Sequence, residues 1–144
     1  MKVTQAIIPL MILLWLATAC SPRSQTPLVR DAWARPGNAG DNSAIYFTIT
    51  NPGSNDDLLV SASSQIAQST ELHSSMMDPS GTMKMEHQTS VPIPARSDVK
   101  FEPGGLHVMV VGLVQDLQEG DRFSVYLNFQ EGGEIEVEVT VKNP

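Results

Sequence analysis

The stretch "EIEVEVTV", residues 134–141, decides the fold class because its hydrophobic residues recur with a period of two. Ile135 and three valines alternate strictly with three glutamates and Thr140. Successive side chains of a β-strand point to opposite faces of the sheet, so this stretch predicts a strand with one buried and one solvated face. That pattern is typical of antiparallel sheets, whereas an amphipathic helix has a period of 3.6.

Upstream of this stretch, the chain is a succession of short segments rich in β-branched and aromatic residues. Clusters such as "RPGNAGDN", "NPGSNDD" and "EPGG" separate them and supply turn-forming residues. No window has a helical period of useful length. We therefore predict an all-β fold, an antiparallel β-sandwich or barrel. The remaining predicted strands are 28–34, 43–51, 57–63, 68–73, 82–88, 98–102, 106–113 and 122–129.

The length of 144 residues favours a single domain behind an export signal. Lys2 is followed by an apolar run, residues 6–16, that is too short for an ordinary transmembrane helix. Small residues then offer a cleavage site, so we interpret 1–19 as a signal peptide of the lipoprotein type. Residues 20–26 form a tether, and residues 27–143 form the β-domain.

Cys20 is the only cysteine, and its context resembles the lipobox of bacterial lipoproteins. A usual lipobox has Leu three residues before the cysteine, whereas here Leu16 lies four before it. We expect Cys20 to be lipidated and the protein to be held at the membrane in the periplasm of a bacterium. The alternative is ordinary cleavage after Ala19, which leaves a free thiol near the mature end. In both cases the chain has no internal disulfide.

The net charge of −7 without any basic run argues against some partners. Nucleic acids and anionic lipid surfaces are recognised by clustered Lys and Arg, which this chain lacks. We therefore expect no nucleic-acid partner, and membrane contact only through a lipid on Cys20.

The histidines and methionines of the β-domain are concentrated in one region. All three histidines and five of the seven methionines lie between residues 73 and 109. A single Met on a strand is usually adaptable packing, and a single His is usually a satisfied polar group. Core packing would scatter Met among all the strands, so the clustering indicates metal ligands. The clustered residues are His73, His87, His107, Met76, Met77, Met83, Met85 and Met109.

The predicted strand 106–113 places two of these side chains on one face. His107 and Met109 are separated by one residue, so they leave the backbone in the same direction, which we expect to be outward. Leu106, Val108 and Val110 lie on the other face and are expected to enter the core. Gly104 and Gly105 are expected to let the backbone turn into the strand without side-chain obstruction.

Met83, Met85 and His87 likewise share one face of their predicted strand, whereas Met76 and Met77 are expected to lie in a turn. Thioether sulfur is soft and neutral and suits Cu(I), and imidazole binds copper generally. The carboxylate clusters of calcium or magnesium sites are absent from the sequence. Methionine also avoids the oxidation to which exported thiols are prone.

The spacing of these residues resembles the motif of the PCuAC-type periplasmic copper chaperones. His73 is followed by Ser74 at an optional Met position, ten residues, Met85, twenty-one residues, and then His107, Val108 and Met109. The contexts "ELH", "GTMKM" and "PGGLHVMVVGL", and upstream "DAWARP" and "AIYFTITN", are also similar to that family. The resemblance covers nearly all of the β-domain.

The resemblance implies a cupredoxin-like β-sandwich with one solvent-accessible Cu(I) site per chain, formed by His73, Met85, His107 and Met109. It also implies delivery of copper to the CuA subunit of cytochrome c oxidase, directly or with a Sco-type protein, and no enzymatic activity. Some members carry a His- and Met-rich tail, whereas this chain ends in "VTVKNP", so we expect no second site. The motif does not include His87, Met76 or Met83, which are candidate auxiliary ligands.

Other classes fit the residues less well. A blue-copper electron carrier needs a Cys thiolate beside two His, and the only Cys is in the lipobox. A metal-dependent hydrolase or oxidase needs an open coordination position with a general base or a redox partner, and no such pairing is visible. A β-sandwich interaction module without metal, with residues 76–109 as a partner-binding patch, remains an alternative, as does copper storage or tolerance.

Overall fold

The computed structural model describes residues 26–143, so the signal peptide and Cys20 lie outside the described residues. The described chain is all β, as predicted, and no part of it forms a helix that could cross a membrane. Its strands are β1 (Leu28–Ala34), β2 (Ser43–Asn51), β3 (Asp57–Ser63), β4 (Ala67–Met77), β5 (Met83–His87), β6 (Val91–Ile93), β7 (Ser97–Phe101), β8 (Leu106–Leu113), β9 (Arg122–Phe129) and β10 (Gly133–Val141).

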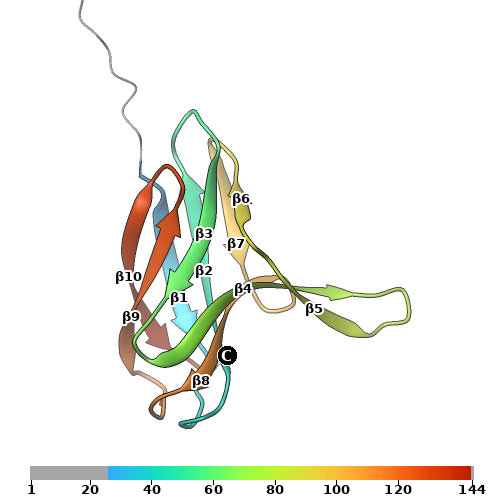
Figure 1. Ribbon diagram of the computed structural model, residues 1–144, viewed down its shortest axis with the longest axis vertical. Helices are drawn as coiled ribbons and strands as arrows, with labels where there is room; N and C mark the ends of the chain where they lie inside the picture. Colours follow the sequence, from blue (N-terminus) through green and yellow to red (C-terminus); the bar gives the residue numbers. More distant parts are fainter. Residues whose placement is uncertain (1–25, 144) are drawn as a thin grey trace, which may run out of the picture.

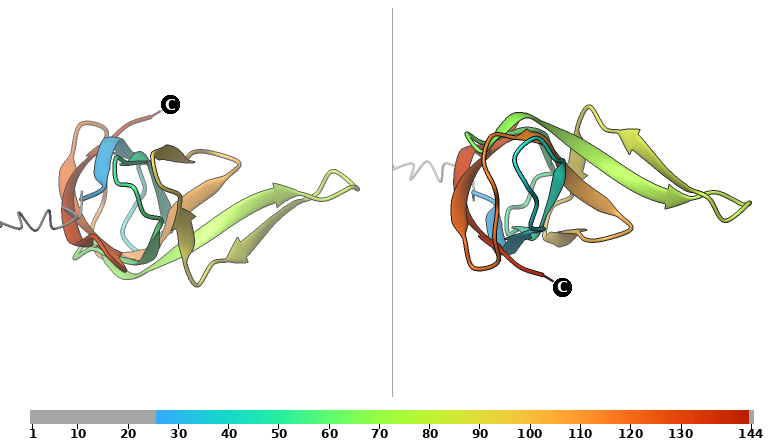
Figure 2. Two further views of the ribbon diagram at one scale, coloured as in Figure 1. Left: turned by 90° about the horizontal axis from the view of Figure 1, so that it is seen from above. Right: turned by 90° about the horizontal axis from the view of Figure 1, so that it is seen from below.

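The ten strands belong to one sheet in the order β5-β4-β8-β7-β2-β1-β10-β9-β3-β6, and β8 also pairs with β2. The sheet curls around on itself, as the views along the body show (Figure 2), and the residues that it encloses form an apolar core. Most neighbours are antiparallel, as predicted, but β1 runs parallel to β10, and β7 pairs in parallel with β8 at Phe101 and Leu106. The all-β sandwich or barrel expected from the sequence is therefore present as one curled sheet, with two short parallel pairings.

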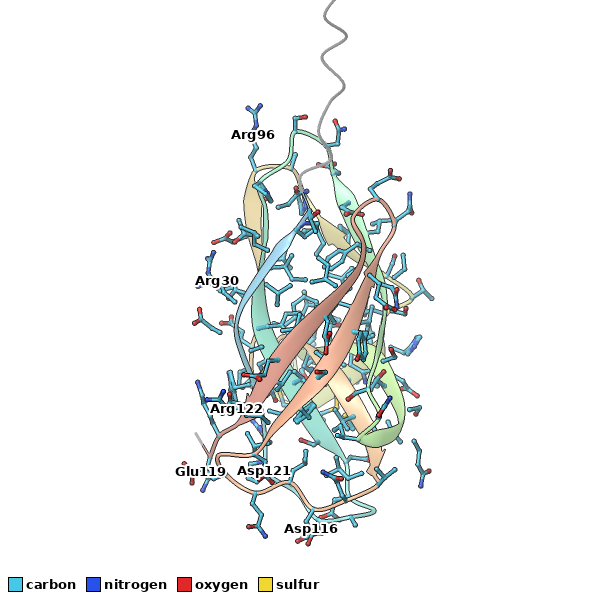
Figure 3. All side chains as sticks on the ribbon, turned by 90° about the vertical axis from the view of Figure 1, so that its left-hand side faces the viewer. Arg30, Arg96, Asp116, Glu119, Asp121 and Arg122 are labelled. Carbon is cyan, nitrogen blue, oxygen red and sulfur yellow. The ribbon has the colours of Figure 1, made fainter. Side chains whose placement is uncertain are left out.

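The alternation that predicted β10 is visible in its burial. Val137, Val139 and Val141 are buried in the core, whereas the three glutamates of the strand, Glu134, Glu136 and Glu138, are exposed. Arg122 of β9 lies on the solvated face (Figure 3). It donates a hydrogen bond to Glu138 at 3.0 Å. The period of two thus separates an apolar interior from a charged exterior, because burying the valines removes their surface from water.

The strand β6 was not predicted, and its sequence explains why. Its middle residue is Pro92, which has no backbone N–H to donate and normally argues against a strand. The strand lies at one edge of the sheet and pairs only with β3. Proline is tolerated at such an edge because the missing donor is not needed by a second neighbour.

The prediction that Met76 and Met77 lie in a turn was wrong. Strand β4 continues to Met77, which pairs directly with Met83 of β5. The turn begins only at Asp78, whose carboxylate accepts hydrogen bonds from the backbone N–H groups of Ser80 and Thr82 at 2.9 Å. The hairpin of β4 and β5 is therefore longer than predicted, and it projects from the body as an arm (Figures 1 and 2).

Candidate metal centre

The three histidines lie side by side on three adjacent strands. His73 of β4 is in direct register with His87 of β5 on one side and with His107 of β8 on the other. Directly opposed residues of an antiparallel pair project from the same face of the sheet. The imidazole centroids are 5.7 Å apart for His73 and His87, and 5.8 Å apart for His73 and His107. Residues far apart in sequence thus form one row of imidazoles.

Strand β8 separates its two faces as predicted. Val108 and Val110 are fully buried in the core, and Leu106 packs against it. His107 and Met109 lie on the opposite face, but His107 is only 3% exposed rather than turned outward to solvent. The ring of Tyr46 from β2 lies 6.3 Å from the His107 ring, centroid to centroid. The histidine is therefore buried on the non-core side of the strand.

His73 and His107 each use one ring nitrogen to donate a hydrogen bond to an oxygen atom. His107 Nδ1 donates to the backbone carbonyl of Gly105 at 3.1 Å, and His73 Nε2 donates to the Glu71 carboxylate at 2.8 Å. Because these oxygens only accept, the hydrogen bonds fix the tautomers of both rings. His107 Nε2 and His73 Nδ1 then keep free lone pairs. His73 Nδ1 is buried and has no hydrogen-bond partner within the described chain.

Burial also keeps His107 uncharged. Loss of solvation lowers the pKa of its imidazole below the ordinary value of 6.5, and electrostatic interactions with His73 and Arg35 lower it further. The hydrogen bond to Gly105 opposes this shift without overcoming it. A metal binds the neutral imidazole, so a lowered pKa keeps His107 available as a ligand in mildly acidic solution.

This lowered pKa predicts a pH dependence of folding stability. Below about pH 6.5, His107 takes up a proton more readily in the unfolded chain than in the folded one, so protons stabilise the unfolded state. The free energy of unfolding of the metal-free domain should therefore be fully retained above pH 6.5 and fall as the pH is lowered below it. Urea unfolding between pH 8 and pH 5 measures this, with His107→Gln as the variant that lacks the titrating group. Identical pH profiles for the two proteins would contradict the prediction.

A pocket of about 300 Å³ opens beside His107. Three of the four predicted ligands, Met85, His107 and Met109, line it together with Met83. The fourth predicted ligand, His73, is not part of the lining, but it is the register partner of His107 and lies next to that residue. Tyr46, Ser43, Ala44, Asn42, Arg35, Ser75 and Gly104 complete the lining. The structure thus brings the four predicted side chains to one place on the sheet.

The remaining candidates are placed differently. His87 is exposed and meets the His73 ring edge-on, next to the pocket but outside its lining. Met76 is in register with Lys84, so it lies on the other face of the hairpin from Met77. Gly104 has a φ of +82°, which only glycine adopts without strain, whereas Gly105 has no such requirement.

Two supporting groups were not predicted from the sequence. Glu71 holds the His73 ring, and the Gly105 carbonyl accepts both from His107 and from the Ser75 backbone N–H at 2.9 Å. Glu71 stands two residues before His73 on the same strand, so the period of two already placed both on one face. The carbonyl of Gly105 has no comparable signature, because every residue carries one.

The donor set determines which metals can bind. Within residues 26–143, no three carboxylate, imidazole or thiol groups are arranged to hold a metal ion. A metal at this pocket would therefore need thioether sulfur in addition to imidazole nitrogen, and Met83, Met85 and Met109 line the pocket. Two neutral imidazoles with two neutral thioethers form a soft set that suits Cu(I) better than a hard cation.

Comparisons with known proteins identify relatives in sequence and structures with the same fold. The chain is 33% identical over 129 residues to "Putative lipoprotein Lxx21020" of Leifsonia xyli subsp. xyli, covering 88% of this chain and 77% of the relative. Its fold matches the "Copper-bound PCuAC domain from PmoF2" with a TM-score of 0.70 at 21% identity, over 84% and 96% of the two chains. It also matches the solution structure of CuI-DR1885 from Deinococcus radiodurans with a TM-score of 0.57 at 30% identity, over 86% and 85%.

The predicted likeness to PCuAC domains is thereby confirmed in the fold. The model of the family described as "Putative lipoprotein LpqE-like" matches residues 28–141, from the first residue of β1 to the last residue of β10. The match therefore includes every strand that contributes to the pocket, and the chain belongs to the LpqE-like family.

Proposed function

We propose that the protein is an exported chaperone that carries one Cu(I) bound by His73, Met85, His107 and Met109. The observation that carries this proposal is that His73 and His107 each donate a hydrogen bond to an oxygen atom through one ring nitrogen. One nitrogen of each ring is committed to Glu71 or Gly105, and the buried Nδ1 of His73 has no partner in the described chain. Such outer partners are typical of metal-binding histidines, because they orient the ring and increase its basicity.

Copper bound in this way is cargo and not a catalyst. The ligands come from both a buried position, His107, and an exposed one, Met85, so the ion lies between the body and the surface of the hairpin. A carrier needs this arrangement, because a receiving protein must reach the ion to take it. Structures of a copper-bound PCuAC domain and of CuI-DR1885 share the fold, which supports copper as the ion.

We further propose that the receiving protein is the CuA subunit of cytochrome c oxidase, reached directly or through a Sco-type protein. The experiment uses the chain with Cys20→Ser, so that no thiol competes for the ion. Anaerobic titration against a chromogenic Cu(I) chelator should count one ion per chain. Mixing at least two equivalents of the loaded chain with a metal-free CuA domain, followed by one-electron oxidation with ferricyanide, should then restore the absorption of the mixed-valence CuA centre. Absence of tight Cu(I) binding contradicts the chaperone, several tight ions favour storage, and binding without transfer contradicts only this recipient.

We propose that the protein is held in the bacterial envelope, in the periplasm, by a lipid on Cys20. The family to which it belongs is described as lipoproteins, which supports the proposal. Cys20→Ser should move the protein from the membrane fraction to the soluble periplasmic fraction, because the substitution removes the thiol that would carry the lipid. Cell fractionation with mass spectrometry of the mature protein measures this. Unchanged fractionation, together with a wild-type mass that includes no lipid, would contradict it.

A further inference from the structure

The methionines of the hairpin are exposed in a way that core packing does not explain. Four of the seven large apolar side chains that are exposed in residues 26–143 are methionines of β4 and β5. Met77 is 68% exposed, Met85 61%, Met76 51% and Met83 50%. Apolar side chains gathered on an exposed surface usually mark a functional site.

The register of the hairpin places three of these methionines on one face. Met77 is directly opposite Met83, and Met85 follows Met83 by two residues. The Cβ atoms of an opposed pair lie about 5 Å apart and those of a diagonal pair about 7–8 Å apart, which long side chains can span. The sulfurs of Met77, Met83 and Met85, which we call the thioether row, can therefore approach one ion. Met76 lies on the other face, opposite Lys84.

The thioether row is continuous with the pocket. Met83 and Met85 line the pocket together with His107 and Met109. Ser75 of β4, the register partner of Met85, also lines the pocket. Met77 is the member farthest along the arm, at the last residue of β4 before the turn. Because the arm projects from the body (Figures 1 and 2), another protein can reach this end without contacting the rest of the sheet.

We propose that the thioether row of Met77, Met83 and Met85 is a Cu(I) exchange site, through which the ion passes between a partner and the buried imidazoles. This inference rests on the proposed function. Thioethers are neutral, so the ion remains Cu(I) and no proton or electron is transferred. Bonds from copper to the imidazoles and to Met109 break as bonds to Met77 and Met83 form, while Met85 belongs to both sets. One ion per chain is therefore retained.

The test measures both the rate of Cu(I) transfer and the equilibrium affinity for Cu(I), in the Cys20→Ser chain. Cu(I) transfer to an excess of chromogenic chelator is followed by stopped-flow absorbance. Met77→Leu, at the member of the row that lies outside the pocket lining, should slow transfer about tenfold or more, because Leu has no soft donor, while the equilibrium affinity changes by less than about twofold. Met76→Leu is the matched control on the opposite face of the same hairpin and should change neither. Equal transfer rates in Met77→Leu and in the control overturn the proposal.

A second measurement tests whether the thioether row binds a soft ion in a chain that lacks the buried ligand His107. In the His107→Leu chain, Ag(I), a redox-stable soft ion, should shift the methyl resonances of Met77, Met83 and Met85 but leave Met76 unchanged. No shift in the thioether row, in a chain that circular dichroism shows to be folded, overturns the proposal. If the wild-type chain binds no Cu(I) in the titration, the proposed function fails instead, so the two failures are distinguishable.

Discussion

Replacing Met109 with leucine should weaken Cu(I) binding by about 100-fold or more, since loss of a direct ligand should exceed the 10–100-fold cost of losing an outer partner. Leu has a similar volume and apolarity, and a volume-conserving swap usually costs less than about 1.5 kcal/mol of stability. Met109 is half-buried beside Ala44 of β2, its register partner. Leucine can therefore occupy the space that the methionine side chain fills, without displacing its neighbours. Competition titration with a Cu(I) chelator measures the affinity, and urea unfolding measures the stability.

A control variant shows whether the loss of Cu(I) affinity in Met109→Leu is specific to Met109. Met76→Leu removes another methionine of the same region, but one on the far face of the hairpin, and should leave Cu(I) affinity unchanged. Binding of Cu(II), which favours nitrogen and oxygen donors, should suffer less from Met109→Leu than binding of Cu(I). Equal losses for Met109→Leu and Met76→Leu would indicate a diffuse methionine surface and contradict the four-ligand site.

Glu71→Ala should weaken Cu(I) binding by about 10–100-fold, although we place no copper on its carboxylate. Glu71 accepts the Nε2 proton of His73 and so leaves Nδ1 as the metal-binding nitrogen. Without that acceptor, the ring loses both its orientation and the basicity that the carboxylate supplies. Glu71→Gln keeps an acceptor oxygen without the charge and should recover part of the affinity. Chelator competition on the three proteins measures the series.

An alternative view of Glu71 is that its contact with His73 is only a surface ion pair. Such pairs contribute about 0–1 kcal/mol to stability and have no effect on a metal site. Glu86→Ala is the matched control, since Glu86 is in register with Ser74 and lies on the other face of the hairpin. If Glu71→Ala and Glu86→Ala have the same Cu(I) affinity, Glu71 does not position His73.

The fold followed from local sequence patterns where one face of a strand is buried and the other is not. The alternation in 134–141 and the apolar run in 106–113 set strand boundaries that match β8 and nearly match β10. The two faces of β8 were also predictable, because Val108 and Val110 had to share a side. Sandwich topology could be expected only as a class, since strand order depends on contacts between distant segments.

The site was predicted from spacing, but its geometry was not. Nothing in the sequence places His87, His73 and His107 in one register, because that depends on how β4 pairs with both β5 and β8. The prediction that His107 lies on the face of β8 opposite the core is confirmed, but its burial there was not predicted, since the period of two separates the faces and does not tell what covers them. Tyr46 comes from β2, more than sixty residues earlier in the chain.

The two outermost strands of the sheet, β5 and β6, leave backbone groups free to pair with a strand of another molecule, a common route to aggregation. Both carry features that discourage such pairing: Pro92 interrupts the donors of β6, and Lys84 and Glu86 put charge on β5. A protein concentrated on a membrane by a lipid would meet copies of itself often. Edge strands that resist self-association would keep the arm available for contacts with different proteins.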